Sequence, residues 1–382
     1  MQSATLSTAA TGEIDTLLQQ AVECHAVPGV VAIVANRETV LYRGAVDASP
    51  TALYRIASMT KPVTSVGIMI LRERGLLELD DPLERYLPAF AGREVMQDFN
   101  VADASFGQRP ASGPITLRHL LAHTAGFGYT FCNPILLVLE KSGVKFSRSL
   151  PKLPLLHDPG SQWTYSSATA ILGEVIERIT GEPFYIFLQT QILQPLGMFD
   201  TGYFLKPEDG KRLMPIYNRV DGQLRPEPQP KPYKPYLLAD GGLVGTAGDY
   251  IRFMQMLLNL GQLGPIRLLT EQSVREMTGN QIGQLTVETQ PGLDPGVSCS
   301  FPIGAGIDTF GLGFQITETT SEHARSQGSY SWGGIYNTHF WGDPQMGIGA
   351  VLFTQLLPYY DEACIRLLHD FEACVYKNLV RC

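Results

Sequence analysis

The chain has 382 residues, of which 44% are hydrophobic and 17% are charged, as in ordinary globular proteins. Its net charge of −8 and the lack of a basic run argue against nucleic acid or an anionic membrane as a partner. It has neither a membrane-spanning run of about 18 apolar residues nor the N-terminal pattern of a signal peptide. We therefore expect a cytoplasmic protein, unless a leader has been removed.

The spacing of cysteine and histidine gives no sign of a metal site. The six cysteines are scattered without a Cys-x-x-Cys pair, and the seven histidines include no His-Glu-x-x-His pair. In a reducing compartment such cysteines are simply core or surface thiols. We expect no metal and no cofactor.

The first third of the chain mixes strand and helix patterns. Two apolar runs predict a β-hairpin, at residues 30–35 and 40–44. Helical spacing of apolar residues predicts helices at 14–24, 58–75 and 116–123. Thr116 is a good N-cap for the last of these helices.

The middle of the chain is mostly helical, and strand patterns return near its end. We expect an irregular region at 130–160 and a proline-rich loop at 225–235. Helices are predicted at 167–180, 183–193, 249–260 and 361–379. Strands are predicted at 312–318, 335–341 and 346–354.

This order of elements predicts an α/β (α+β) fold. Strands from both chain ends would share one antiparallel sheet flanked by helices, with a mostly helical lobe inserted between them. We expect residues 1–57 and 240–382 to form the sheet lobe and residues 58–239 the helical lobe. A ligand cleft would then lie at the junction of the lobes, beside Ser58.

Ser58-Met59-Thr60-Lys61 at the head of the predicted long helix is the first candidate for chemistry. Residues three apart on a helix lie on the same face, so Lys61 would lie beside the Ser58 hydroxyl. A serine hydroxyl is a weak nucleophile until a neighbouring base activates it. The free amides of a helix N-terminus also favour an anion.

Two further segments could join this serine and lysine. Tyr165 lies just before the helix at 167–180, which Ser167 would cap, and its hydroxyl could point into a cleft. For a single tyrosine, however, a core position with one hydrogen bond is the more common case. Trp332-Gly333-Gly334 comes before a predicted strand, where glycine permits close approach of a backbone to a ligand or simply makes a turn.

The three segments together resemble the serine β-lactamase and penicillin-binding-protein superfamily, whose signatures are Ser-x-x-Lys, Tyr-x-Asn and Lys-Thr-Gly. The stretches 120–126 (Leu-Leu-Ala-His-Thr-Ala-Gly) and 241–249 also resemble its class C-like branch. The sequence is most similar to family VIII carboxylesterases, which carry Trp-Gly-Gly as the third motif. Fungal statin acyltransferases are a more distant likeness.

The resemblance implies roles for the matching residues. Ser58 matches the nucleophile, Lys61 its activating partner and Tyr165 the general base and proton shuttle. The amides of Ser58 and Ile335 match the oxyanion hole, a large source of transition-state stabilisation. Trp332, Gly333 and Gly334 match the substrate-binding strand. The sequence leaves open whether Lys61 or Tyr165 is the base.

Two departures from the β-lactamase motifs bear on substrate choice. Ser167 stands where that motif has asparagine, and Trp332 stands where it has the lysine that binds a penicillin carboxylate. An indole would instead offer an apolar wall that suits neutral esters. We therefore predict a serine hydrolase that cleaves short-chain carboxylic esters through an acyl-enzyme.

Other functions remain open from the sequence. The same site could serve an acyltransferase or a weak β-lactamase, since all three reactions pass through an acyl-enzyme. A catalytically silent, penicillin-binding-like protein is the alternative of another class, although such a protein would need none of Ser58, Lys61 and Tyr165 together. The natural ester, its acyl length and the oligomeric state are not encoded in any recognisable motif.

Overall fold

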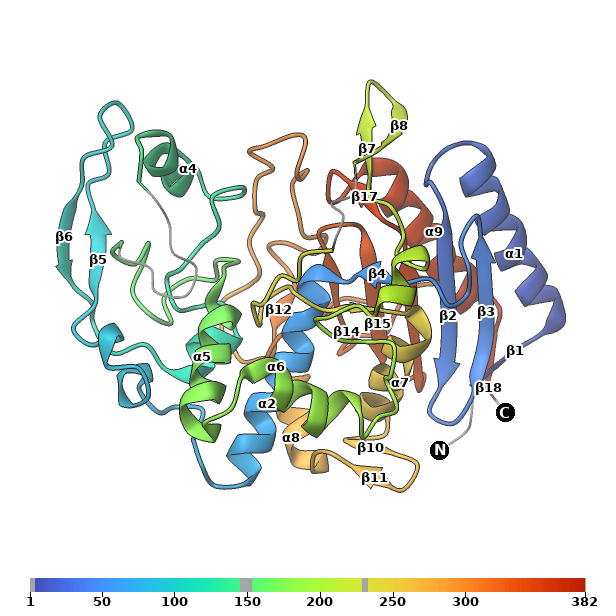
Figure 1. Ribbon diagram of the computed structural model, residues 1–382, viewed down its shortest axis with the longest axis horizontal. Coiled ribbons are helices and arrows are strands. Elements are labelled where there is room, and N and C mark those ends of the chain that lie inside the picture. The colour runs from blue at the N-terminus through green and yellow to red at the C-terminus, as the bar shows by residue number, and fades with distance from the viewer. Residues whose placement is uncertain (1–3, 145–152, 229–232, 382) are drawn as a thin grey trace.

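A seven-stranded sheet organises the computed structural model, which describes residues 4–144, 153–228 and 233–381. Every neighbouring pair of its strands is antiparallel. Across the sheet the strands are β12 (Thr309–Phe310), β13 (Gln315–Ile316), β14 (Tyr330–Gly334), β15 (Thr338–Asp343), β16 (Ile348–Phe353), β2 (Val30–Asn36) and β3 (Val40–Val46). Because β16 pairs with β2, the two chain ends meet in one sheet, as predicted (Figure 1).

Helices cover both faces of this sheet. All of β2 is buried, and its side chains alternate between two cores. Val31 and Ile33 face the core that contains α7 (Ala247–Leu258), whereas Val30 and Val34 face the core formed with α1 (Thr8–Glu23) and α9 (Glu362–Lys377). This explains why β2 reads as an unbroken apolar run.

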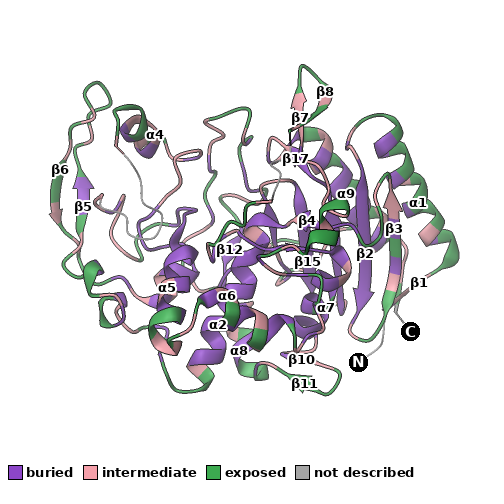
Figure 2. Ribbon diagram, in the orientation of Figure 1, coloured by how far each residue is buried: buried purple, intermediate pink, exposed green. Residues whose placement is uncertain are grey.

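Helix α2 (Thr60–Glu73) is the central helix of the helical lobe. Every residue from Thr60 to Leu71 is buried, as the purple helix in Figure 2 shows. Helices α5 (Ala168–Thr180) and α6 (Phe184–Leu188) pack against it. A helix that is enclosed on all sides buries its polar side chains too, and Lys61 is one of them.

Shorter elements tie distant segments together. The additional helices are α3 (Leu117–Leu121), α4 (Pro134–Lys141) and α8 (Glu271–Met277). Small sheets pair β1 (Ala4–Leu6) with β18 (Leu379–Arg381), β4 (Tyr54–Arg55) with β9 (Val244–Gly245), β5 (Glu94–Gln97) with β6 (Gly107–Pro110), β10 (Gln262–Leu263) with β11 (Ile266–Arg267), and β17 (Leu356–Leu357) with β7 (Tyr217–Val220) and β8 (Gln223–Pro226). The β4–β9 pair fixes the segment before Ser58 against the residues that follow Asp240.

Three predicted elements need correction. The region 130–160 is not wholly irregular, because α4 begins at Pro134, a first helical position where proline is tolerated. The strand predicted at 335–341 is wrong at its start, since Trp332–Gly334 ends β14 and β15 begins only at Thr338. The loop predicted at 225–235 begins inside β8, and its residues 229–232 lie outside the described part of the chain.

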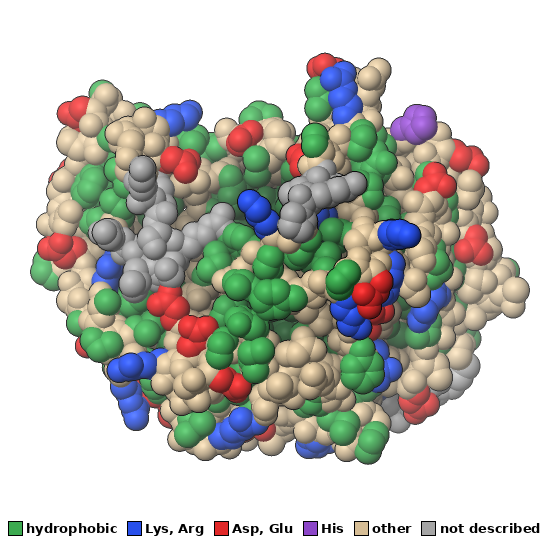
Figure 3. Space-filling model, viewed as in Figure 1, with side chains coloured by type: hydrophobic (Ala, Val, Ile, Leu, Met, Phe, Trp, Pro, Cys, Tyr) green, Lys and Arg blue, Asp and Glu red, His purple; other side chains and the backbone are tan. Residues whose placement is uncertain are grey.

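The surface of the molecule mixes charged and apolar side chains. Hydrophobic side chains gather near α6 at the centre of one face (Figure 3), and Ile186, Phe199 and Phe204 are exposed there or nearby. None of the helices in the described ranges has both the length and the apolarity needed to cross a bilayer. The division into lobes at residues 57/58 and 239/240 stays a prediction.

Candidate active site

Ser58 lies on a short, strained turn that directly precedes the α-helix. The turn is a 3-10 helix over Ala57–Met59, and α2 begins directly after it at Thr60. Ala57 has a φ of 45°, a left-handed conformation that costs a non-glycine residue of the order of 1 kcal/mol. This geometry places the Ser58 side chain beside the N-terminus of α2.

Lys61 and Tyr165 converge on the Ser58 hydroxyl. Lys61 Nζ lies 3.1 Å from Ser58 Oγ, and Tyr165 Oη lies 2.7 Å from the same oxygen. Both partners are buried, with 1% of Lys61 and 3% of Tyr165 exposed. The structure thus brings together the three residues that the sequence proposed, and both candidate bases contact the candidate nucleophile.

Tyr165 is held by aromatic packing and by the start of α5. Its ring lies 5.0 Å from the rings of His123 and Trp332, measured between centroids. Ser167 occupies the N-cap position of α5 as expected, but its side chain makes no capping bond. The Ser166 hydroxyl instead accepts a hydrogen bond from the Ala168 amide.

His123 supports this packing as a neutral side chain. It is fully buried between Tyr165 and Phe310, and its Nδ1 lies 3.2 Å from Ser166 Oγ. Burial, and to a lesser extent the nearby Lys61, lowers the pKa of the imidazole well below its ordinary value. His123 therefore packs against the Tyr165 ring, and its Nε2 has no hydrogen-bond partner among the described residues.

The strand β14 runs close to the backbone that precedes Ser58. A Cβ atom on Gly334 would lie 2.3 Å from the Ile56 carbonyl oxygen, so only glycine fits there. This close approach puts Ile335 on the wall of the same cleft as Ser58. Their two amides remain the candidates for an oxyanion hole.

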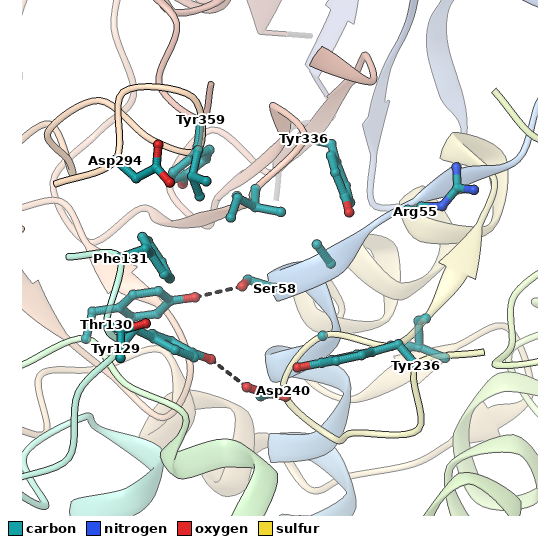
Figure 4. Close-up of a pocket in the computed structure, with 18 of the residues that line it drawn as sticks. Arg55, Ser58, Tyr129, Thr130, Phe131, Tyr236, Asp240, Asp294, Tyr336 and Tyr359 are labelled. Carbon is teal, nitrogen blue, oxygen red and sulfur yellow. Dashed lines mark hydrogen bonds between the residues drawn. The ribbon is translucent and has the colours of Figure 1, made fainter. Parts of the chain in front are cut away.

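The cleft above Ser58 is wide and carries several aromatic side chains on its wall. Its volume is about 590 Å³, and its wall includes Tyr129, Phe131, Tyr233, Tyr236 and Tyr336. Arg55 and Asp294 lie on opposite sides of Ser58 (Figure 4). In the described residues, no group of three His, Cys, Asp or Glu side chains is arranged to hold a metal ion.

Comparison with known proteins agrees with this geometry. The family model described as Beta-lactamase matches residues 14–374, nearly the whole chain. The chain belongs to the β-lactamase family.

Relatives within the β-lactamase family include esterases and acyltransferases. Esterase EstB of Burkholderia gladioli is 30% identical over 89% of each chain. The monacolin J acid methylbutanoyltransferase of Aspergillus terreus is 30% identical over 85% of this chain and 82% of its own. The structure of a simvastatin synthase variant from Aspergillus terreus superposes with a TM-score of 0.82 at 28% identity, covering 97% of this chain and 98% of the other.

These likenesses define the protein at a coarse level. It is a member of the β-lactamase family that is similar both to an esterase and to acyltransferases. The fold is the expected α/β arrangement. An enzyme of the serine hydrolase or acyltransferase type follows from the family and its relatives.

The sequence predicts that the Trp332 indole forms an apolar wall of the cleft. In the structure, Trp332 is not among the residues that line the cleft of Ser58. Its indole is buried behind Tyr165, and its Nε1 lies 3.4 Å from the Tyr165 hydroxyl. Gly333 and Ile335, by contrast, line the cleft. Side chains alternate along β14, so the indole points towards the ring of Phe310 while Gly333 faces the other way.

Sequence reasoning missed two site residues. The Tyr129 hydroxyl accepts a hydrogen bond from Lys61 Nζ at 3.2 Å. It donates one to Asp240 Oδ2 at 2.5 Å, as the dashed line in Figure 4 shows. The Asp240 carbonyl oxygen accepts a further bond from Lys61 Nζ at 2.8 Å. In the sequence, Tyr129 lies three residues after the segment 120–126, and Asp240 directly precedes the segment 241–249. Proximity to these two family-like segments is the only sequence signal for either residue.

Proposed function

We propose that this protein is a carboxylesterase that hydrolyses short-chain esters through an acyl-enzyme on Ser58. The observation that carries the proposal is the contact of one serine hydroxyl with both a lysine and a tyrosine. A positioned base beside the hydroxyl is the usual way in which a protein activates serine. The likeness to an esterase of Burkholderia gladioli supports hydrolysis as the reaction.

The geometry supports an ordinary two-stage reaction. The Ser58 oxygen would attack the ester carbonyl carbon while its proton moves to the Tyr165–Lys61 pair. Amides of Ser58 and Ile335 would stabilise the negative carbonyl oxygen. The pair would then return the proton to the departing alkoxide, which leaves as an alcohol. In the second stage water would attack the acyl-enzyme and release the acid.

The test uses p-nitrophenyl esters of increasing acyl length with the purified protein. We expect turnover that is fastest for short acyl chains, together with an acyl adduct on the Ser58 peptide. Absence of both turnover and adduct across the series would contradict esterase function.

Acyl transfer is the second candidate, and the size of the cleft favours it. A volume of about 590 Å³ exceeds what a short acyl group fills, which leaves room for a larger acceptor alcohol. An acyltransferase of Aspergillus terreus is among the relatives. Chromatography of products formed with and without an added aromatic alcohol would separate the two reactions, because transfer yields a new ester instead of the acid.

Weak β-lactamase activity depends on where a penicillin carboxylate would bind. From Trp332 alone we expect esters to be preferred by a few hundredfold or more, since a buried carboxylate without a cationic partner costs roughly 3–4 kcal/mol. The cleft wall, however, carries Arg55 and Lys234, which the sequence argument did not include. Specificity constants for a butyrate ester and a penicillin, measured on one preparation and repeated with Arg55→Gln, would show how far these cations reduce the preference.

A further inference from the structure

The amino group of Lys61 is surrounded by neutral oxygen atoms. It donates to the Asp240 carbonyl at 2.8 Å, to Ser58 Oγ at 3.1 Å and to Tyr129 Oη at 3.2 Å. An ammonium group has three donors, and here each has an acceptor. The aromatic rings of Tyr165 and Tyr129 also lie 4.9 Å and 5.4 Å from Nζ, where they attract a cation.

The Asp240 carboxylate lies one hydroxyl group away from this amino group. It is buried, with 3% of the residue exposed, and its Oδ2 accepts the Tyr129 hydroxyl proton at 2.5 Å. Its Oδ1 has no hydrogen-bond partner among the described residues. Because the Tyr129 proton is committed to Asp240, the lone pairs of the Tyr129 oxygen are left to face Lys61.

The loop that carries Asp240 is fastened to α2 on both sides. The Thr64 hydroxyl donates to the Ala239 carbonyl at 2.7 Å, and the Leu243 amide donates to Thr60 Oγ1 at 3.1 Å. A Cβ atom on Gly242 would lie 1.8 Å from the Tyr236 carbonyl oxygen, so the loop packs too closely for a larger residue. Asp240 is therefore held in a fixed position relative to Lys61.

We propose that Asp240 is a positioning residue that acts through Tyr129 to keep Lys61 as an ammonium ion, so that Tyr165 is the base. A buried carboxylate favours the charged, ammonium form of a nearby amine. The ammonium in turn favours a phenolate at Tyr165, which takes the Ser58 proton as the serine oxygen bonds to the acyl carbon. The phenol then gives that proton to the departing alkoxide. This inference rests on the proposed ester chemistry of Ser58.

The test is the pH dependence of kcat/KM for p-nitrophenyl butyrate, measured between about pH 6 and pH 11. The alkaline limb reports the loss of the ammonium. Asp240→Asn keeps the backbone carbonyl and the shape of the side chain but removes its negative charge. We therefore expect the alkaline limb to move to lower pH by about one unit. Tyr129→Phe should move it similarly, because the link to Asp240 is cut.

The double variant and a matched control make the test specific. If Asp240 acts through Tyr129, the double variant should show the shift of one single variant and not the sum. Asp308→Asn removes another buried carboxylate, which accepts a hydrogen bond from Gln315 and lines a different cavity from that of Ser58, and it should leave the limb in place. A melting curve for each variant confirms that it is folded, and Tyr129→Phe suffices if Asp240→Asn does not fold.

Three results would overturn the inference: a limb that stays in place in the folded variants, a limb that moves to higher pH, or shifts that add in the double variant. Failure of the proposed function looks different. In that case the unaltered protein itself shows no ester turnover and no adduct on Ser58.

Discussion

Lys61 and Arg325 are both largely buried basic side chains, and their surroundings differ in kind. Arg325 forms a direct bidentate ion pair with Glu372, and its guanidinium lies over the ring of Trp341. Lys61 contacts three neutral oxygens, and the Tyr129 hydroxyl links it to the Asp240 carboxylate. The Arg325 side chain is 16% exposed, and the whole Lys61 residue is 1% exposed.

The difference indicates different uses of a buried charge. A carboxylate in direct contact fixes a cation and stabilises the fold once the desolvation of both groups is offset. A cation held by neutral oxygens keeps its field available to other groups, here the hydroxyls of Ser58 and Tyr165. We therefore expect substitutions around Lys61 to change the reaction, and substitutions at the Arg325–Glu372 pair to change the stability.

The largest effect should come from Ser58→Ala. Removing the nucleophile of a catalytic unit eliminates almost all of its rate, so kcat/KM for a butyrate ester should fall by at least ~10⁴-fold. The melting temperature should match that of the unaltered protein, because only one partly exposed oxygen is lost. Steady-state kinetics with a melting curve checks both, and substantial retained activity would place the nucleophile elsewhere.

Lys61→Met tests the catalytic side of the comparison directly. Methionine approximates the length of lysine without its charge, so we expect a loss of about 10²–10⁴-fold in kcat, as for an acid–base group. Asp240 Oδ2 would keep its bond from Tyr129, which limits the cost to the fold. A variant that melts far below the unaltered protein, with normal turnover of the folded fraction, would make Lys61 a structural cation like Arg325.

Tyr165→Phe removes only the phenolic oxygen next to Ser58. If that oxygen relays the proton, kcat should fall by about 10²–10⁴-fold, while binding of a non-reactive ester analogue should change little. The Trp332 indole would lose one long contact at 3.4 Å, a minor effect on packing. An unchanged kcat would assign Tyr165 to the core.

Glu372→Leu tests whether the Arg325–Glu372 ion pair stabilises the fold. It leaves Arg325 without its carboxylate, and we expect the free energy of unfolding to fall by roughly 3 kcal/mol, the low end for a buried pair because the guanidinium is partly exposed. Denaturant unfolding measures this loss. The folded variant should hydrolyse esters at nearly the normal rate, and a parallel loss of kcat would show that the two regions are coupled.

The smallest expected effect is on the acid stability of the fold. Burial opposes ionisation of Glu372, but Arg325 outweighs it, and the pKa of this carboxyl lies below its ordinary value of 4.5. A group whose pKa is lower in the folded state stabilises the fold above that ordinary value and ceases to do so as the pH falls through its folded pKa. Between neutral pH and about pH 3, the stability advantage over Glu372→Leu should therefore shrink, as denaturant unfolding at each pH would show.

Much of this site could be predicted because its parts are local patterns. Ser58 and Lys61 are adjacent on one helical turn, and the apolar runs of β2 and β16 predict buried strands from composition alone. Tyr129 and Asp240 could not be found in this way, since each touches Lys61 only through long-range packing. The direction of Trp332 likewise depends on how β14 pairs with β15, which no local pattern determines.

The central claim is that Ser58 carries the acyl group, and peptide mass spectrometry tests it most directly. The protein is mixed with p-nitrophenyl butyrate, quenched in acid within the first turnovers and digested. We predict the mass of one butyryl group on the peptide that contains Ser58, and no such mass in Ser58→Ala. A butyryl group on another residue, or active ester turnover with no adduct at any quench time, would contradict the account.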